Sequence, residues 1–419
     1  MVRKKLFITA IAIFSFIVFL SIFVILWFWG DRYPDFSNKD FTASAEIPGL
    51  EDGFVPQGIA NYTHTTGNDG IVKQEYLFVS SYRDGSPSRL YVTGTRTGYI
   101  GFVTLKNEDG TDYTGHAGGV ATSCNNSDAN GNKVPVKNGT LWVVSDGTVY
   151  CAKASSSEYY NIAEEVIKKA ALTDGENVIQ FTASFKANNK ASFCFFYEDG
   201  KVNISDDKLY VGEFYRPGDD RYSTAENHHV TTLDGAEQYA FVTEYSSNTT
   251  TNNAYGVTLL TDSYVKGEDG ELVKKDVPKV DKVISIPDKI QGFAITKSKQ
   301  LVLSQSYGLP NSHLYYYNWN TITETTAANR ASFSSLTGNN FEYEEVYKKS
   351  GAKYSTESMY VYFADESRAI RDYSVPSMAE GLCVNDDRIY VLFESGCYKY
   401  KPFVRQRIYD VYVFTPREK

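Results

Sequence analysis

The sequence predicts an all-β protein: a single β-propeller preceded by one N-terminal transmembrane helix. Two observations lead to this prediction. Short phrases made of a polar residue, a glycine and an apolar run recur along the chain, and a strand-like segment follows each of them. Tyrosine (33) and phenylalanine (25) are abundant while methionine (3) is scarce, and aromatic residues favour half-buried, pleated surfaces. Repeated strand units of this kind stack or close into a ring.

The N-terminus begins with Arg3, Lys4 and Lys5, followed by an apolar segment at 6–29 without a charged residue. As a helix this segment would be about 35 Å long, enough to cross a bilayer core of about 30 Å. We expect a cytoplasmic tail at 1–5, a signal-anchor helix at 6–29, a stalk at 30–43 and an extracytoplasmic body at 44–419. The expected location is the cell membrane, with a single pass and the N-terminus inside. The alternative is a cleaved signal peptide, whose apolar core is shorter and ends in small residues.

The recurring phrases organise the body into units. The phrases are at 56–60, 116–121, 290–294 and 379–383, and the strands that follow them are at 76–82, 141–145, 301–307 and 388–394. The first unit adds strands at 88–92 and 99–103, and the second adds 148–151 and 178–181. A helix at 159–172 interrupts the second unit, because Ile162, Val166 and Ala170 recur at spacings of four.

The third unit has no glycine at its start, and it contains strands at 191–196, 208–214, 239–243, 255–259 and 280–286. The fourth continues with 312–317 and an insertion at 329–354, and the fifth ends with 409–414. Strands grouped in fours at regular intervals favour a five-bladed propeller. Six blades is the alternative, if 222–260 forms a blade of its own. A strand at 41–47 is the candidate that seals the ring.

The glycines of the phrases indicate where neighbouring sheets should pack most closely. Sheets of a propeller lie closest together at the axis, so small residues are expected there, and the phrases supply Gly58, Gly118, Gly119, Gly292 and Gly381. The polar residue before each glycine should then lie near one mouth of the axial channel. This candidate axial ring is Gln57, His116, Gln291 and Glu380, with Ser192 as an approximate counterpart in the third unit. These residues either hydrogen-bond neighbouring blades or form a ligand site, since convergent polar groups mark pockets.

Other residues suggest chemistry less specifically. His228 and His229, with His116 and Glu213 or Glu380, could offer nitrogen and oxygen ligands to zinc or another divalent ion, and Asp-Gly turns could bind calcium. The acid pairs Glu213–Glu244 and Glu380–Glu394 could serve a glycosidase. Glu213, His228, His229 and Glu244 are therefore secondary candidates. Their spacing matches no metal motif, and the nucleophile, zinc-protease and phosphate-loop motifs are absent.

The charge of the chain limits which classes of partner are expected. The net charge is −9, and the body without Arg3, Lys4 and Lys5 carries −9 − 3 = −12. An acidic body without a basic run argues against nucleic acid, since phosphate contacts need clustered cations. The expected partner is therefore an extracellular small molecule, glycan or protein.

The five cysteines are predicted to be buried free thiols, because strands separate Cys124 from Cys151 and Cys383 from Cys397.

The residues also support a resemblance. The first unit resembles blades of the quinoprotein/YVTN-like and SMP-30-like propeller superfamily, and the resemblance covers most of 50–415. The segments that carry it are Gln57-Gly58-Ile59, the strand end 79–82, the strand 88–92 and Thr97-Gly98. The Gln-Gly phrase is also similar to the five-bladed plant-type glutaminyl cyclases, which implies a metal-assisted site, although residues 79–82 replace their Ser-Thr-Gly signature. We expect a membrane-anchored binding module that uses the channel mouth. The alternative is a propeller hydrolase or glutaminyl-cyclase-like enzyme.

Overall fold

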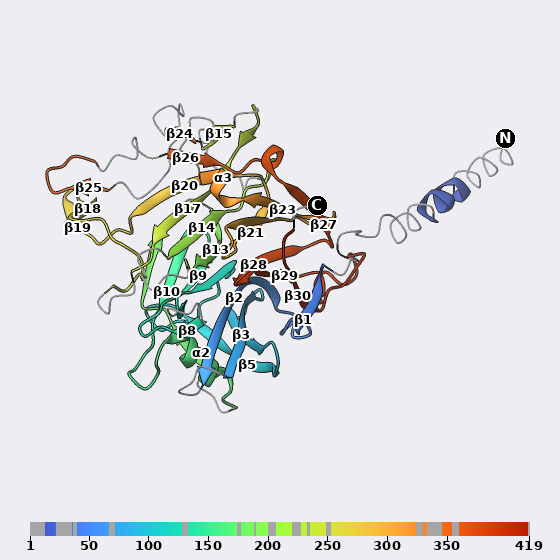
Figure 1. The fold of residues 1–419 in the computed structure, drawn as a ribbon, viewed down its shortest axis with the longest axis horizontal. Helices are drawn as coiled ribbons and strands as arrows, with labels where there is room; N and C mark the ends of the chain where they lie inside the picture. Colours follow the sequence, from blue (N-terminus) through green and yellow to red (C-terminus); the bar gives the residue numbers. More distant parts are fainter. Residues whose placement is uncertain are drawn as a thin grey trace, which may run out of the picture.

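The structure is a computed structural model, shown in Figure 1. It describes residues 13–21, 36, 40–66, 72–127, 133–173, 177–187, 190–199, 207–219, 228–232, 235–248, 253–323, 330–332, 346–353 and 360–417. The expected signal-anchor segment at 6–29 lies outside this set except for residues 13–21, which are helical. Within the described ranges no helix is both long and apolar enough to span a bilayer.

The fold is all-β and propeller-like, with five sheets of four or more strands among the described residues. The first sheet runs from the inside outward as β2 (Val55–Thr66), β3 (Val72–Tyr82), β4 (Arg89–Gly94), β5 (Gly98–Lys106) and β11 (Val178–Gln180). The second runs β6 (Gly119–Thr122), β9 (Leu141–Ser145), β10 (Thr148–Ala152) and β12 (Ala183–Lys186). The third runs β13 (Ala191–Tyr197), β14 (Lys208–Glu213), β17 (Ala240–Ser246), β20 (Val280–Ile286), β26 (Tyr360–Phe363) and β24 (Arg330–Ser332).

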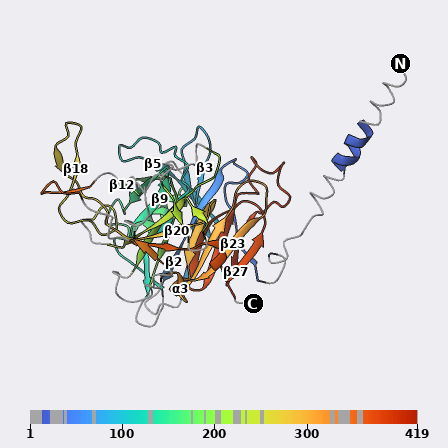
Figure 2. The same ribbon diagram turned by 90° about the horizontal axis from the view of Figure 1, so that it is seen from above.

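The last two sheets repeat the pattern. The fourth runs β21 (Ile290–Ile295), β22 (Gln300–Gln305), β23 (Ser312–Asn318) and β27 (Arg371–Val375), and the fifth runs β28 (Ala379–Asn385), β29 (Arg388–Phe393), β30 (Asp410–Phe414) and β1 (Thr42–Glu46). Smaller sheets pair β7 (Asn125–Ser127) with β8 (Lys133–Pro135), β15 (Val230–Thr231) with β16 (Glu237–Gln238), and β18 (Ser263–Lys266) with β19 (Leu272–Lys274) and β25 (Tyr347–Lys348). The sheet of β18, β19 and β25 projects from the body in both views (Figures 1 and 2).

The innermost strands lie side by side around one axis. Contacts between them follow the cyclic order β2, β6, β13, β21, β28 and back to β2. The glycines of the phrases lie at these contacts, as expected. A Cβ on Gly58 would lie 2.6 Å from the Val120 nitrogen, one on Gly119 would lie 2.5 Å from the Cys194 nitrogen, and one on Gly381 would lie 2.9 Å from the Gln57 oxygen. Each inner strand therefore packs backbone against backbone on the next.

Buried serines join neighbouring sheets in the same way at two places. Ser80 on β3 donates to the Ala117 carbonyl at 2.8 Å, and Ser304 on β22 donates to the Ala379 carbonyl at 3.1 Å. Both serines come from the strand that follows a phrase, and both acceptors directly precede a glycine or glutamate of the next phrase. The repeat in the sequence therefore corresponds to a repeated contact between sheets.

The N-terminal strand completes the fifth sheet, as expected for residues 41–47. β1 pairs antiparallel with β30, with Thr42 opposite Val413. It begins within the segment expected as a stalk. Just before it, the Phe41 ring stacks on Phe414 with centroids 4.5 Å apart, and the Phe36 ring lies 4.5 Å from Tyr412. The arm that leads into the body is therefore bound to its last sheet.

Several strands differ from the sequence expectation. Residues 178–180 form β11, which pairs in parallel with β5 of the first sheet, whereas 178–181 was expected in the second, whose outer strand is β12. Residues 255–259 supply no strand to the third sheet, where β17 pairs directly with β20. Since β17 lies between β14 and β20, residues 222–260 do not make a separate large sheet. These outer positions depend on contacts between distant segments, which local patterns do not encode.

Helices are few among the described residues. α2 (Ile162–Ala170) confirms the helix expected at 159–172, and the Asn161 side chain caps it by accepting from the Glu164 nitrogen. The short α3 (Trp319–Thr323) and the 3₁₀ helix η3 (Glu366–Arg368) lie between outer strands. All five cysteines are buried free thiols, as expected.

We predict that Gly58→Ala lowers the free energy of unfolding by about 1–3 kcal/mol, the usual cost of overpacking, because the added Cβ meets the backbone of β6. Urea unfolding followed by tryptophan fluorescence measures the change. Gly267→Ala is the matched control, since a Cβ there first meets the end of the Asp269 side chain at 2.9 Å. Equal effects in the two variants would contradict a crowded axis.

Candidate functional site

The polar residues of the phrases sit at irregularities of the inner strands. The pairing register shifts at Gln57 in β2, at Gln291 in β21, at Glu380 in β28 and at Ser192 in β13. A bulge of this kind turns a side chain away from its regular direction. Ser192 is thus the third unit's counterpart to the axial ring, despite its lack of a following glycine.

These side chains line one cavity of about 500 Å³, here called the axial cavity. All four residues of the candidate axial ring take part, and Ser192 joins them. The lining residues are Gln57, Tyr82, His116, Gly118, Ser145, Asp146, Lys190, Ala191, Ser192, Phe214, Gln291, Tyr307, Gly308, Met378, Glu380, Glu394, Lys399 and Tyr400. A volume of this size suits a small molecule.

Four of the lining residues form a hydrogen-bonded chain that crosses three sheets. The Gln57 amide donates to Glu394 Oε2 at 3.0 Å, and Gln57 Oε1 lies 2.6 Å from His116 Nε2. Because an amide oxygen only accepts, His116 Nε2 carries the proton of this bond. Glu394 in turn hydrogen-bonds Glu380. The chain Glu380–Glu394–Gln57–His116 links the fifth, first and second sheets.

Glu380 and Glu394 form a carboxyl pair that holds a proton near neutral pH. Burial, and then the charge of Glu394, raise the pKa of Glu380 well above its usual range. Burial raises the pKa of Glu394 to about 7, while bonds from Gln57 and the charge of Lys399 oppose the rise. Two carboxyls in hydrogen-bond contact cannot both ionise easily, so they share a proton.

His116 lies beside this pair and faces the cavity. Desolvation lowers the pKa of His116, and the charge of Asp146 opposes this effect. The Tyr82 ring lies 3.9 Å from the imidazole, between centroids, and Lys399 Nζ donates to the Tyr82 hydroxyl at 3.3 Å. The main-chain nitrogen of His116 donates to Ser145 Oγ at 3.1 Å. His116 is therefore oriented by its surroundings and is favoured in its neutral form.

Glu213 and Glu244 lie in the third sheet, whereas His228 and His229 directly precede β15 of a smaller sheet. None of these secondary candidates lines the axial cavity. Glu213 is fully buried, and its Oε2 is 2.8 Å from His228 Nε2 and accepts from the Phe241 nitrogen at 3.1 Å. His229 pairs instead with Glu237, at 3.4 Å between Nε2 and Oε2. The expected joint site of His228 and His229 with His116 is therefore not formed.

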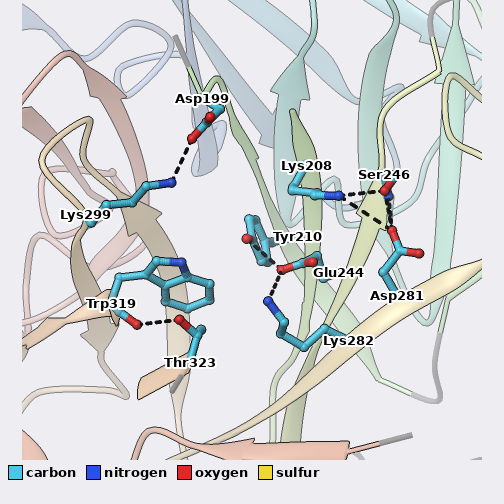
Figure 3. Close-up of polar contacts among 10 residues, drawn as sticks. All are labelled: Asp199, Lys208, Tyr210, Glu244, Ser246, Asp281, Lys282, Lys299, Trp319 and Thr323. Carbon is cyan, nitrogen blue, oxygen red and sulfur yellow. Dashed lines mark hydrogen bonds and ion pairs between the residues drawn. The ribbon is translucent and has the colours of Figure 1, made fainter. Parts of the chain in front are cut away.

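Glu244 lies in a separate cluster, shown in Figure 3. It accepts from the Tyr210 hydroxyl at 2.9 Å and from Lys282 Nζ at 3.2 Å, and Lys282 lies 5.7 Å from the Trp319 ring. The pair Glu213–Glu244 is thus divided between two networks. Among the described residues, no three His, Cys, Asp or Glu side chains gather as metal ligands would.

The opposite end of the axis is narrow. A cavity of about 40 Å³ there is lined by residues of all five inner strands. Two ion pairs involve lining residues at this end, Lys133–Glu198 at 3.2 Å and Lys297–Asp386 at 3.7 Å. The axial cavity at the other end is thus the larger space along the axis.

Sequence reasoning missed part of the lining. The missed lining residues end a strand, follow one or lie in a loop, where no phrase repeats. They are Tyr82, Asp146, Lys399 and Tyr400. The residue pattern Ser-Ser-Tyr at 80–82 and Ser-Gln-Ser-Tyr at 304–307 does recur, and both tyrosines line the cavity. That signal could have indicated Tyr82 and Tyr307, whereas nothing in the sequence indicates Lys399.

Comparison with known proteins finds similarity among solved structures but not among family models or curated proteins. No protein-family model matches the sequence, and no curated protein matches it either. Among solved structures, the chain is similar to the PQQ-bound form of aldose sugar dehydrogenase from Streptomyces coelicolor, with 11% identity, a TM-score of 0.33 and coverage of 89% of this chain and 95% of that one. A likeness of this degree assigns neither a cofactor nor a substrate to the present chain.

The carboxyl pair predicts a pH-dependent stability. Because folding raises the pKa of Glu394 from 4.5 to about 7, the folded state holds more protons between these values, and the free energy of unfolding falls as pH rises through this window. Glu380→Gln leaves one ionisable carboxyl and should reduce this fall by about 1–2 kcal/mol. Urea unfolding at about pH 5 and about pH 8 tests this. The exposed Glu51→Gln serves as control, and an unchanged pH dependence in Glu380→Gln would argue against proton sharing.

Proposed function

We propose that this protein is a membrane-anchored, five-bladed β-propeller that binds a small polar extracellular ligand in the axial cavity. The observation that carries the proposal is the convergence of the repeated polar positions on that one cavity. Gln57, His116, Gln291 and Glu380 come from segments up to 323 residues apart (380 − 57 = 323), and each precedes a glycine of a repeated phrase. A repeat preserved in four units at one mouth favours a shared role there.

The arrangement of the sheets supports five blades. Five inner strands contact one another in a closed cycle, and each begins one of the five large sheets of the described residues. The third sheet has two extra strands, but β17 is one of its central members and does not start a blade. This arrangement supports five blades over six.

Anchoring rests mainly on the sequence. Three basic residues precede an apolar segment long enough to cross a bilayer, and the basic end is expected to stay in the cytoplasm. The helical residues 13–21 expose apolar side chains, with Phe14 and Phe19 each 69% exposed. Exposed apolar surface on a helix is consistent with lipid contact. The axial cavity would then lie outside the cell.

The lining indicates the ligand's chemistry. The shared proton and the amides of Gln57 and Gln291 offer both donors and acceptors, and Tyr82, Tyr307 and Tyr400 add aromatic rings with hydroxyl groups. Such a surface suits a ligand rich in hydroxyl or amide groups, from a glycan end to a small metabolite. No nucleic acid is expected, since the net charge is −9.

An enzymatic role at the same mouth is the second candidate, as a hydrolase or a cyclase. The observation that favours it is a carboxyl whose pKa is about 7, at Glu394, connected through the Gln57 amide to the imidazole of His116, whose pKa is lowered by burial. A general acid or base works best with a pKa near the operating pH. Turnover that follows this ionisation in a substrate panel, and that is lost in Glu394→Gln, would favour the enzyme over the binding module.

Gln291→Ala separates ligand binding from ring closure, because Gln291 lies outside the chain Glu380–Glu394–Gln57–His116. A ligand found by a thermal-shift screen of saccharides, amino acids and small metabolites should bind at least about tenfold more weakly to this variant, the typical effect of a lost hydrogen bond to a polar ligand. Isothermal titration calorimetry measures the affinity. His229→Ala, outside the cavity, should bind as the parent does. Unchanged binding in Gln291→Ala, with destabilisation in Gln57→Ala, would assign the axial ring to closure alone.

A further inference from the structure

The segment 395–409, which is the loop between β29 and β30 without its first residue Glu394, has a composition unlike the rest of the body. It contains Lys399, Lys401, Arg405 and Arg407 and no acidic residue, whereas the whole chain has a net charge of −9. Its charge of +4 leaves −13 on the remainder (−9 − 4 = −13). The loop is therefore a local cationic segment on an acidic protein.

The loop also exposes apolar rings. Tyr398 is 73% exposed, Phe403 is 61% exposed and Tyr409 is 43% exposed. The same loop buries Val404 and Ile408, so its own small core is already filled. Among the large hydrophobic side chains exposed on the described residues beyond 36, three of eight belong to this loop. Exposed aromatic residues next to cations are typical of segments that lie at a lipid–water interface.

The loop is held in a fixed shape rather than extended. Ser395 and Cys397 at its start are fully buried, and the Ile408 nitrogen donates to Ser395 Oγ at 3.2 Å. Arg407 Nε donates to the Lys401 carbonyl at 3.0 Å, which ties the two halves of the loop together. The rings at its surface are therefore presented by an ordered backbone.

Phe36, which follows the apolar N-terminal segment in the sequence, packs close to the base of this loop. The Phe36 ring packs 5.8 Å from Phe393 and 4.5 Å from Tyr412, the strands that the loop connects. Only seven residues separate Trp29 from Phe36 (36 − 29 = 7), and seven extended residues span at most about 25 Å. Figure 1 shows β1, β30 and β29 together at one edge of the body. If the apolar segment lies in a bilayer, that edge must remain near the bilayer surface.

We propose that the 395–409 loop docks onto the anionic lipid headgroups of the membrane that holds the N-terminal segment. Its lysines and arginines would contact phosphate groups, and Tyr398 and Phe403 would enter the interface. Each basic residue near an anionic surface adds roughly a fivefold gain in binding. This inference rests on the anchoring in the proposed function. Since Lys399 and Tyr400 also line the axial cavity, docking places the cavity mouth beside the headgroups.

Hydrogen exchange on the full chain tests the proposal. The protein is reconstituted in phosphatidylcholine nanodiscs with or without about 30% phosphatidylglycerol, and the amides of 395–409 are followed. We expect about tenfold slower exchange in the anionic discs, lost at about 0.5 M salt, where charges are screened within a few ångströms. Equal exchange in both lipids would overturn the proposal. Protection that grows with protein concentration would indicate self-association and would overturn it too.

A matched pair of variants identifies the surface. A triple variant of the loop should lose the lipid-dependent protection of its amides from hydrogen exchange. It combines Lys401→Gln, Phe403→Ser and Arg407→Gln. The control is Lys274→Gln with Val273→Ser and Lys349→Gln, which likewise removes two cations and one apolar side chain, at exposed residues of the projecting sheet or the turn after it. The control should keep full protection. Full protection in the loop variant, or loss in the control, would contradict docking by this loop.

Alkaline carbonate extraction separates this inference from the anchor on which it rests. A chain that stays with liposomes after extraction, yet exchanges equally in both lipids, would overturn the docking alone. A chain released by carbonate would overturn the anchor and, with it, the docking. Ligand binding in the axial cavity is measured independently of both outcomes.

Discussion

The close approach of backbones at the axis is the constraint on which the rest of the structure depends. Gly58, Gly119 and Gly381 allow neighbouring inner strands to touch without a Cβ between them. The pairing register shifts next to Gly58 in β2 and across Gly381 in β28, whereas β6, which carries Gly119, keeps a regular register. The polar residue at each shift is displaced toward the mouth of the channel. Crowding and the polar lining are thus two results of one packing problem.

Residues that join neighbouring sheets also line the axial cavity, so closure of the ring and a position at the cavity do not exclude each other. The chain Glu380–Glu394–Gln57–His116 joins sheets, and its members also face the cavity. Burying two carboxyls is costly unless a proton and hydrogen bonds compensate, and Gln57 supplies a donor to one of them. Gln291 and Ser192 stand outside this chain, so they face the cavity without joining the sheets through it. One side of the cavity lining is therefore held by hydrogen bonds between sheets, whereas Gln291 and Ser192 lie outside these bonds.

Much of the ring was predictable from local patterns, because strands, glycines and phrases repeat at short range. The inner strands, the sealing strand β1 and the helix α2 all followed from such signals. The parallel additions β11 and β26 did not, since their partners lie 74 and 78 residues away along the chain (178 − 104 = 74 for Val178 and Thr104, 361 − 283 = 78 for Val361 and Val283). At the site, the repeated positions were found and Lys399 was not, because a loop residue is placed by tertiary contacts alone. The different partners of the adjacent His228 and His229, which are Glu213 and Glu237, were likewise not indicated by the sequence.

The pairing of β1 with β30 has a consequence for the order of folding. Thr42 is among the first residues of the body to be synthesised, and its partner Val413 is among the last. During synthesis β1 has no partner strand, and Phe36 and Phe41 lack the rings that later cover them. Contacts of such long sequence separation form slowly, because a loop of several hundred residues must close first. The fifth sheet is therefore completed only after β30 has been made, and until then the nascent chain carries an open strand edge that invites pairing with another copy.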